Sequence, residues 1–65
     1  MNALLKTNNQ EIEFSFEIVN GMIIWLKYRY LGNDLVHFAK TRALKVDKKG
    51  YYFMFYKKKV RVDVY

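Results

Sequence analysis

Apolar and polar side chains alternate along residues 11–18, with isoleucine or phenylalanine at every second position. A period of two predicts a β-strand that buries one face. Residues 22–31 are equally rich in β-branched and aromatic side chains, and Asn20-Gly21 between the two segments is a typical hairpin turn. We therefore expect the first half of the chain to form an antiparallel hairpin.

Further turn signals at 32–34 and 47–50, and a weaker one at 56–60, divide the remaining chain. The segments between them carry many Val, Tyr and Phe residues, which suit a half-buried sheet. We predict a mostly β fold, a small five-stranded antiparallel meander of the SH3-like or a related small-barrel type. Its strands are expected at 10–18, 22–31, 35–46, 51–56 and 59–65.

The register of the first hairpin follows from the need to keep one face apolar. A two-residue turn would place Phe14 opposite Lys27. A three-residue loop, with Gly21 in the left-handed conformation, places Phe14 opposite Leu26 instead. We predict this second register, which also forms two pairs of opposite charge, Glu13 with Lys27 and Glu11 with Arg29.

The C-terminal hairpins are expected to bury one face in the same way. With a turn at 47–50, Val46 faces Tyr51, and with Lys57-Lys58 at the next turn, Phe55 faces Val60. The expected core of this half is Leu44, Val46, Tyr51, Phe53, Phe55, Val60, Val62 and Val64.

The segment at 34–46 has a second interpretation. Asp34 is a suitable helix cap, and the spacing of Leu35, Ala39 and Ala43 places them on one side of a helix. A helix there gives an α+β domain of the ββαββ type. Turn signals at both ends favour a strand instead, bent near residues 40–42 so that it passes from one half of a barrel to the other.

Sixty-five residues correspond to a single domain over 1–65, near the size below which a core no longer suffices for folding. Residues 1–9 are expected to be either flexible or laid over a sheet edge. The chain has no cysteine and one histidine, which excludes a disulfide framework and a Cys/His zinc site. Self-association as a homodimer is the expected supplement to so small a core.

The inventory of catalytic side chains is small. Ser15 is the only serine, and no histidine is expected beside it to activate it. His37 stands among apolar residues, and the three glycines are dispersed at turns rather than gathered in a phosphate loop. We expect no enzymatic activity and no cofactor. The apolar runs are too short for a secretory signal or a membrane span, so we expect a cytoplasmic protein.

Charge is distributed unevenly along the chain, whose net charge is +6. Residues 27–65 carry eleven of the twelve basic side chains against three aspartates. Tyrosines interleave with these cations on the outer face of the C-terminal hairpin. This combination suits single-stranded nucleic acid, because rings stack on bases while cations neutralise phosphates. We predict weakly sequence-specific binding of DNA or RNA by Lys45, Lys48, Lys49, Tyr52, Tyr56, Lys57, Lys58, Lys59, Arg61 and Tyr65.

The same side chains also suit a purely structural role. Tyrosine favours strands, and lysines at turns and sheet edges discourage aggregation.

An exposed tryptophan supports a further hypothesis. The predicted register directs Ile23 and Trp25 to the outer face of the first hairpin, beside Lys27 and Arg29. Trp and Arg dominate interface energetics, so this face suits a larger, acidic protein or a second copy of the chain. The chain would then be a small accessory or inhibitor protein of the kind found in phages and plasmids. Alternatively, residues 3–5 fold back over Trp25.

Overall fold

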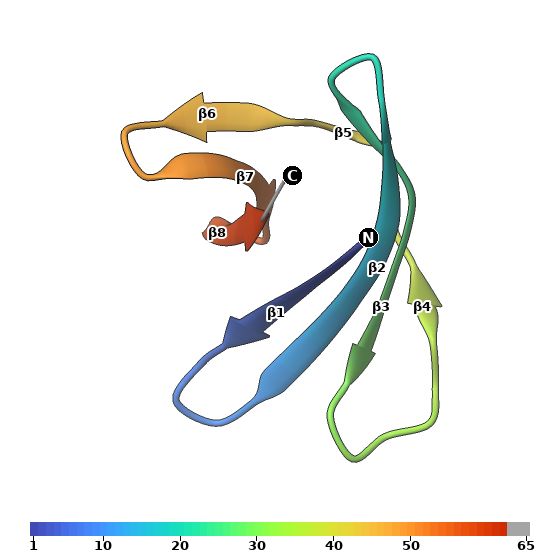
Figure 1. Cartoon of the computed structure of the whole chain (residues 1–65). Helices are drawn as coiled ribbons and strands as arrows, with labels where there is room; N and C mark the ends of the chain where they lie inside the picture. The colour runs from blue at the N-terminus through green and yellow to red at the C-terminus, as the bar shows by residue number, and fades with distance from the viewer. Residues whose placement is uncertain (63–65) are drawn as a thin grey trace.

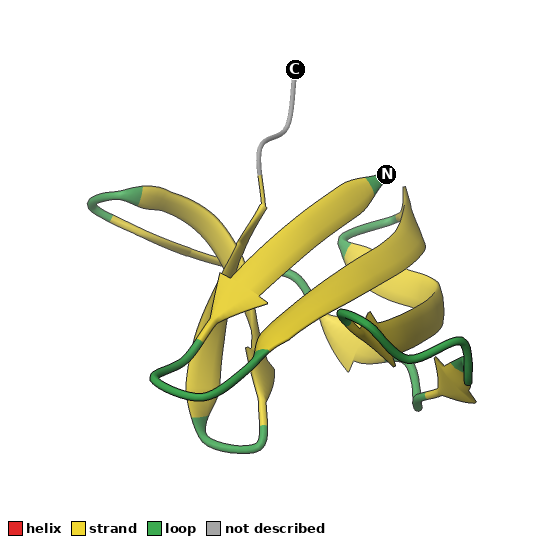
Figure 2. Ribbon diagram, turned by 90° about the horizontal axis from the view of Figure 1, so that it is seen from below, coloured by secondary structure: helices red, strands yellow, loops and turns green. Residues whose placement is uncertain are grey.

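Every regular element in residues 1–62, the part of the chain that this computed structural model describes, is a β-strand (Figure 2). The predicted mostly β, antiparallel fold is confirmed, and the alternative helix at 34–46 is wrong. One sheet contains β1 (Asn2–Lys6), β2 (Glu11–Val19), β3 (Met22–Tyr30), β4 (His37–Phe38) and β5 (Arg42–Ala43), and the other contains β6 (Lys45–Asp47), β7 (Gly50–Phe55) and β8 (Lys58–Val62), as Figure 1 shows.

The first hairpin contains an extra residue, which lies within a strand and not at the turn. Asn20 and Gly21 form a two-residue turn with positive φ values of 51° and 75°. The register of β2 and β3 then shifts between Ser15 and Glu17, where Trp25 has a φ of 51° and forms a β-bulge. The predicted three-residue loop and its register are therefore wrong: Phe14 lies opposite Tyr28 and not Leu26, and this shift of two positions keeps Phe14 on the buried face.

The bulge decides which residues of β3 face the core. Because it adds one residue, Ile23 and Leu26 are both buried, with exposed fractions of 0% and 1%. Trp25 between them points outward, and Ile24 is half-buried. Ile23 was predicted on the outer face, and this prediction is wrong.

The ion pairs of the hairpin follow the observed register. Glu13 lies opposite Arg29 and not Lys27, and Arg29 Nη2 donates to Glu13 Oε2 at 2.9 Å. Glu11 pairs with Lys6 of β1, with 3.8 Å between Nζ and Oε1. The two predicted pairings are therefore wrong, because the observed register moves Arg29 by two positions, from Glu11 to Glu13, and because β1 supplies Lys6 to Glu11.

The N-terminal segment covers a sheet edge. β1 pairs with β2 over its whole length, with Ala3 opposite Phe14. Residues 3–5 therefore lie along β2 and do not fold over Trp25, which stays exposed on β3.

The bent third strand is present as three short pieces. β4 and β5 pair with β3, whereas β6 pairs with β7, so the segment leaves one sheet and joins the other. The crossing is at Leu44, whose N–H donates to the carbonyl of Gly21 at 2.9 Å. β1 and β8 lie beside each other at the opposite seam, where no strand pairing joins them within residues 1–62. Closure into an SH3-like barrel therefore stays a prediction.

The turn between β7 and β8 lies one residue earlier than predicted. Tyr56 and Lys57 form it, with positive φ values of 47° and 67°, so Phe53 and not Phe55 lies opposite Val60. The partner of each residue moves by two positions, and an even shift leaves the same side chains facing inward. Phe53, Phe55, Val60 and Val62 are accordingly buried, as predicted.

Two side chains predicted in this core are exposed instead. Val46 and Tyr51 lie opposite each other near the β6–β7 turn, and both are exposed. Figure 1 shows that this turn projects beyond the five-stranded sheet, which leaves both side chains exposed in the part of the chain that the structure describes. Val64 lies outside the described residues.

Edge-to-face contacts between phenylalanine rings join the two sheets. The ring centroids of Phe53 and Phe55 lie 5.5 and 4.9 Å from that of Phe14. Within residues 1–62, these three rings and six other buried side chains form the core: Ile12, Phe14, Phe16, Ile23, Leu26, Phe53, Phe55, Val60 and Val62.

A matched pair of substitutions tests the position of the bulge. We expect Ile23→Val to lower the free energy of unfolding by about 0.5–1.5 kcal/mol, because it removes a methylene from the core. Ile24→Val removes the same group from the outer face, and we expect a change within about 0.5 kcal/mol. Urea unfolding followed by circular dichroism measures both, and a larger loss for Ile24→Val would place the extra residue at the turn after all.

Candidate nucleic-acid interface

The outer face of the three-stranded sheet brings together predicted residues from all three strands. Lys45 of β6 and Arg61 of β8 lie on either side of Tyr52 in β7, and Lys59 lies opposite Met54. Side chains alternate along a strand, so these residues point away from the phenylalanine core. The structure therefore places part of the predicted set on one surface.

Two of these cations cover the ring of Tyr52. Lys59 Nζ lies 4.7 Å from the ring centroid, and the guanidinium carbon of Arg61 lies 5.4 Å from it. Both distances are within the range of cation–π attraction. A base that stacks on Tyr52 has to displace one of them, so Tyr52 is not a free stacking surface.

Asp47, predicted only as a turn residue, holds both cations in place. Arg61 donates from Nη1 and Nη2 to its two carboxylate oxygens at 2.7 and 3.0 Å, and Lys59 Nζ donates at 3.2 Å. Asp47 lies opposite Gly50, and the missing side chain there leaves a path across β7 to β8. One signal in the sequence pointed to this role, since Asp47 alternates with Val46 and therefore shares the outer face with Lys45.

The surroundings of Asp47 strongly favour the ionised form of its carboxyl group. The Arg61 guanidinium holds the pKa of the Asp47 carboxyl well below its usual range. The N–H of Lys49 and the ammonium of Lys59 lower this pKa further, and together they outweigh the opposing effect of desolvation. A carboxylate therefore lies within the predicted basic face and neutralises part of it.

The remaining predicted cations lie at the two ends of β7. Lys48 and Lys49 form the β6–β7 turn, whereas Lys57 belongs to the β7–β8 turn beside Tyr56, whose side chain is 74% exposed. The predicted turn lysines therefore form two clusters, with the Asp47 ion pairs between them. Tyr65 lies outside the described residues. The lysines of this sheet that make no ion pair with another described residue are Lys45, Lys48, Lys49, Lys57 and Lys58.

The second predicted surface keeps Trp25 and loses the buried Ile23. The Trp25 side chain is 76% exposed, and Phe38 of β4 is 79% exposed opposite Lys27. Arg29 is engaged by Glu13. Phe38 was not predicted as a site residue. Its exposure follows from the pairing of β4 with β3, which places the Phe38 ring on the outer face of the sheet beside Lys27.

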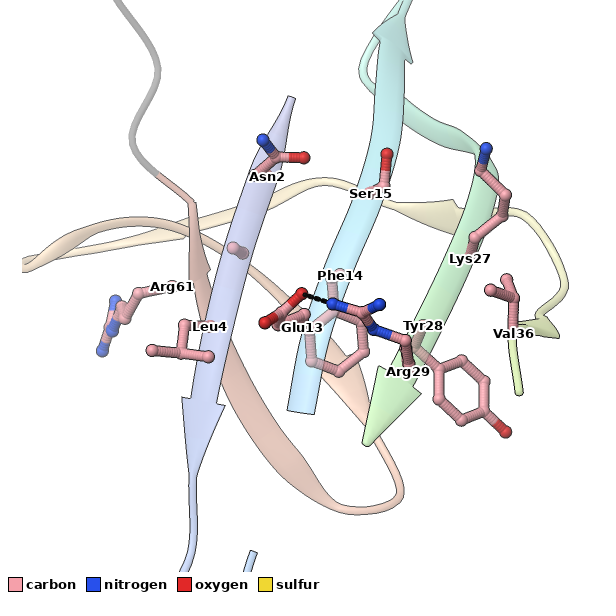
Figure 3. Close-up of a pocket in the computed structure, with 11 residues that line it drawn as sticks. Asn2, Leu4, Glu13, Phe14, Ser15, Lys27, Tyr28, Arg29, Val36 and Arg61 are labelled. Carbon is pink, nitrogen blue, oxygen red and sulfur yellow. Dashed lines mark hydrogen bonds and ion pairs between the residues drawn. The ribbon is translucent and has the colours of Figure 1, made fainter. Parts of the chain in front are cut away.

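A shallow groove of about 750 Å³ crosses the outer face of β1, β2 and β3 (Figure 3). The ion pair of Glu13 and Arg29 lies in its middle, with Leu4 on one side and Val36 on the other. Ser15 also lines this groove. The groove therefore offers a neutralised ion pair between two apolar side chains.

His37 lies away from Ser15, on the inner side of the sheet. Its ring stacks on Tyr28 with 5.1 Å between the centroids. Burial raises the pKa of the Tyr28 hydroxyl, and the neighbouring Tyr56 raises it further. Among residues 1–62, no group of three or more His, Cys, Asp or Glu side chains is arranged to hold a metal ion.

The ion pairs of Asp47 predict a dependence of stability on pH. Because its pKa is depressed in the folded state, its contribution is complete above the usual carboxyl pKa of about 3.9 and is lost as the pH falls through the folded-state value. We expect Asp47→Asn to lose stability less steeply than the parent protein below about pH 4.

Urea unfolding midpoints between neutral and acidic pH measure this dependence. Asp34→Asn is the control, since Asp34 is exposed and makes no ion pair within residues 1–62. Equal acid dependence in Asp47→Asn and Asp34→Asn would contradict the role given to Asp47.

In comparisons with known proteins, no family model matches the chain, and neither a curated protein nor a solved structure matches it significantly. In the described part of the chain, there is no helix of the length and apolar character needed to cross a membrane.

Proposed function

We propose that this chain is a small non-enzymatic domain that binds single-stranded DNA or RNA with little sequence preference. An excess of unpaired cations on its surface carries the proposal. Ion pairs between residues 1–62 engage four of the twelve basic side chains and leave eight without such a partner. One of these, Arg42, is directed inward, with its guanidinium carbon 5.3 Å from the Phe55 ring centroid. The other seven are exposed lysines: Lys27, Lys40, Lys45, Lys48, Lys49, Lys57 and Lys58.

Few carboxylates oppose these lysines. Among residues 1–62, Glu17 and Asp34 are the acidic side chains outside the ion pairs. Lysines that neutralise phosphates release condensed counterions, which makes the affinity fall steeply with salt. Lysine is a flexible point charge, so it tolerates a phosphate backbone of variable path.

The arginines support low sequence preference. Bidentate reading of guanine needs an unengaged guanidinium. Arg29 is held by Glu13, Arg61 is held by Asp47, and Arg42 packs inward. We therefore propose that contacts to phosphate dominate and that base edges are not read.

One observation favours a different partner. The large exposed fraction of Trp25, with Phe38 nearby, suits docking on a larger acidic protein, as an accessory or inhibitor of the kind encoded by phages and plasmids. The loss of the buried Ile23 from this surface leaves Trp25, Lys27 and Arg29 as its predicted members. We rank this function second, because Arg29 is already engaged by Glu13.

Fluorescence anisotropy with labelled single- and double-stranded oligonucleotides over a sodium chloride series tests the first function. We expect binding in the micromolar range at about 50 mM salt, weakening steeply as salt is added. Replacing Lys48 and Lys49 together by Gln should reduce the slope of log K against log salt by about 1.4 for single strands, because two phosphate contacts are lost.

Lys6→Gln serves as the control, because Lys6 is engaged by Glu11 on β1. We expect its salt dependence to equal that of the parent protein. Absence of binding at about 50 mM salt would overturn the proposed function. It would direct the search to a protein partner.

A further inference from the structure

Trp25 occupies a backbone conformation that a bulky residue rarely adopts. Its φ of 51° lies in the left-handed region, which is sterically unfavourable for a bulky side chain. The bulge there lets Ile23 and Leu26 both reach the core, and it leaves the Trp25 side chain on the outer face with 76% of its surface exposed. An apolar side chain is thus displayed at a position where a small polar residue would relieve strain.

β4 brings a second ring to the same face. Phe38 lies opposite Lys27, and cross-strand partners share a face. The N–H of Ala39 donates to the carbonyl of Leu26 at 2.9 Å, which continues the antiparallel alignment and brings Lys40 to the level of Trp25. In this alignment Trp25 and Phe38 are diagonal neighbours, with Lys40 opposite Trp25 and Lys27 opposite Phe38.

The charges around the two rings are mostly positive. Lys27 and Lys40 are exposed and make no ion pair within residues 1–62. The exposed acidic residue nearest to Trp25 in the strand pairing is Glu17, which lies opposite Ile24, the neighbour of Trp25 in β3. The next outward pair, Glu13 and Arg29, is neutral as a unit. This balance favours an anionic partner.

Open rings lie at the predicted Tyr56, which is 74% exposed, and also outside the predicted set. Tyr52 is covered by Lys59 and Arg61. Trp25 and Phe38 are open, and they lie on an outer sheet face among lysines. Aromatic rings on an open face, interleaved with cations, are the arrangement that binds successive bases of a flexible single strand.

We propose that Trp25 and Phe38 form a base-stacking platform for single-stranded nucleic acid, with Lys27 and Lys40 against the phosphates. This inference rests on the proposed function and adds to its phosphate contacts an aromatic contact on the outer face of β3 and β4.

The single tryptophan of the chain reports on this surface alone. We would titrate the protein with an oligothymidylate of about 12 nucleotides at low salt and record tryptophan emission and its quenching by acrylamide. Stacking on Trp25 is expected to quench the emission at the same oligonucleotide concentrations at which anisotropy reports binding. It is also expected to protect the indole from acrylamide.

Two variants test the contribution of each ring. Trp25→Asn suits the positive φ, since Asn tolerates the left-handed region, and Phe38→Leu keeps an apolar side chain in β4. We expect each to weaken binding by about 5- to 150-fold in anisotropy while the salt slope stays the same, because no charge is removed. Tyr52→Leu is the matched control and should change the affinity less than about 2-fold, because its ring is already covered.

The outcomes separate this inference from the function on which it rests. Salt-dependent binding with unchanged Trp25 emission and full affinity in both variants would overturn the platform and leave the proposed function standing. Absence of binding in anisotropy would overturn both. A change from dimer to monomer in Trp25→Asn, seen by sedimentation, together with unchanged oligonucleotide affinity, would assign the face to self-association and overturn the platform. The emission of the parent protein decides the question even if a variant fails to fold.

Discussion

One extra residue in β3 determines how the rest of the molecule is arranged. In this hairpin, the register that pairs Ile18 with Ile23 would place Phe14 opposite Lys27 if it continued unchanged, so the register has to change by one residue between the two ends to keep one face apolar. The bulge at Trp25 makes this change and brings Ile23 and Leu26 into the core. The phenylalanines of β2 then meet those of β7 edge to face, and this contact holds the two sheets together.

The same bulge links folding to the candidate site. Burying Ile23 and Leu26 leaves Trp25 between them on the opposite face, in a conformation with a positive φ. The strain is compatible with a stable fold because the apolar contacts on either side determine the backbone there. The exposed ring is therefore a direct consequence of core packing, whether or not a ligand covers it, and exposure alone assigns no function.

Ion pairs engage some of the surface cations and leave others without a carboxylate partner among residues 1–62. Asp47 gathers Arg61 and Lys59 over Tyr52, and Glu13 holds Arg29, so the arginines on the surface are engaged by carboxylates. The free positive charge lies on exposed lysines near the turns and beside β4. Such a surface attracts a polyanion over a distance and offers little for reading base edges.

The sequence by itself determined the strand content, most of the turn positions, the bent third segment and the inner face of β7 and β8. These features depend on local propensity and on a period of two, and an even shift at the Tyr56-Lys57 turn left that face unchanged. The prediction from the sequence that Trp25 points outward was also correct. Only the tertiary structure decided where the extra residue lies, since a loop of three residues and a bulge in β3 satisfy the same alternation.

Tertiary structure also decided which polar groups meet. The contact of Asp47 with Arg61 spans three strands and depends on the space above Gly50, and the pairing of Glu11 with Lys6 depends on β1. The exposure of Val46 depends on how far the five-stranded sheet extends over the β6–β7 turn, and that of Phe38 on the pairing of β4 with β3. These pairings depend on which strands become neighbours and in which register, and the alternation along a single strand does not determine either.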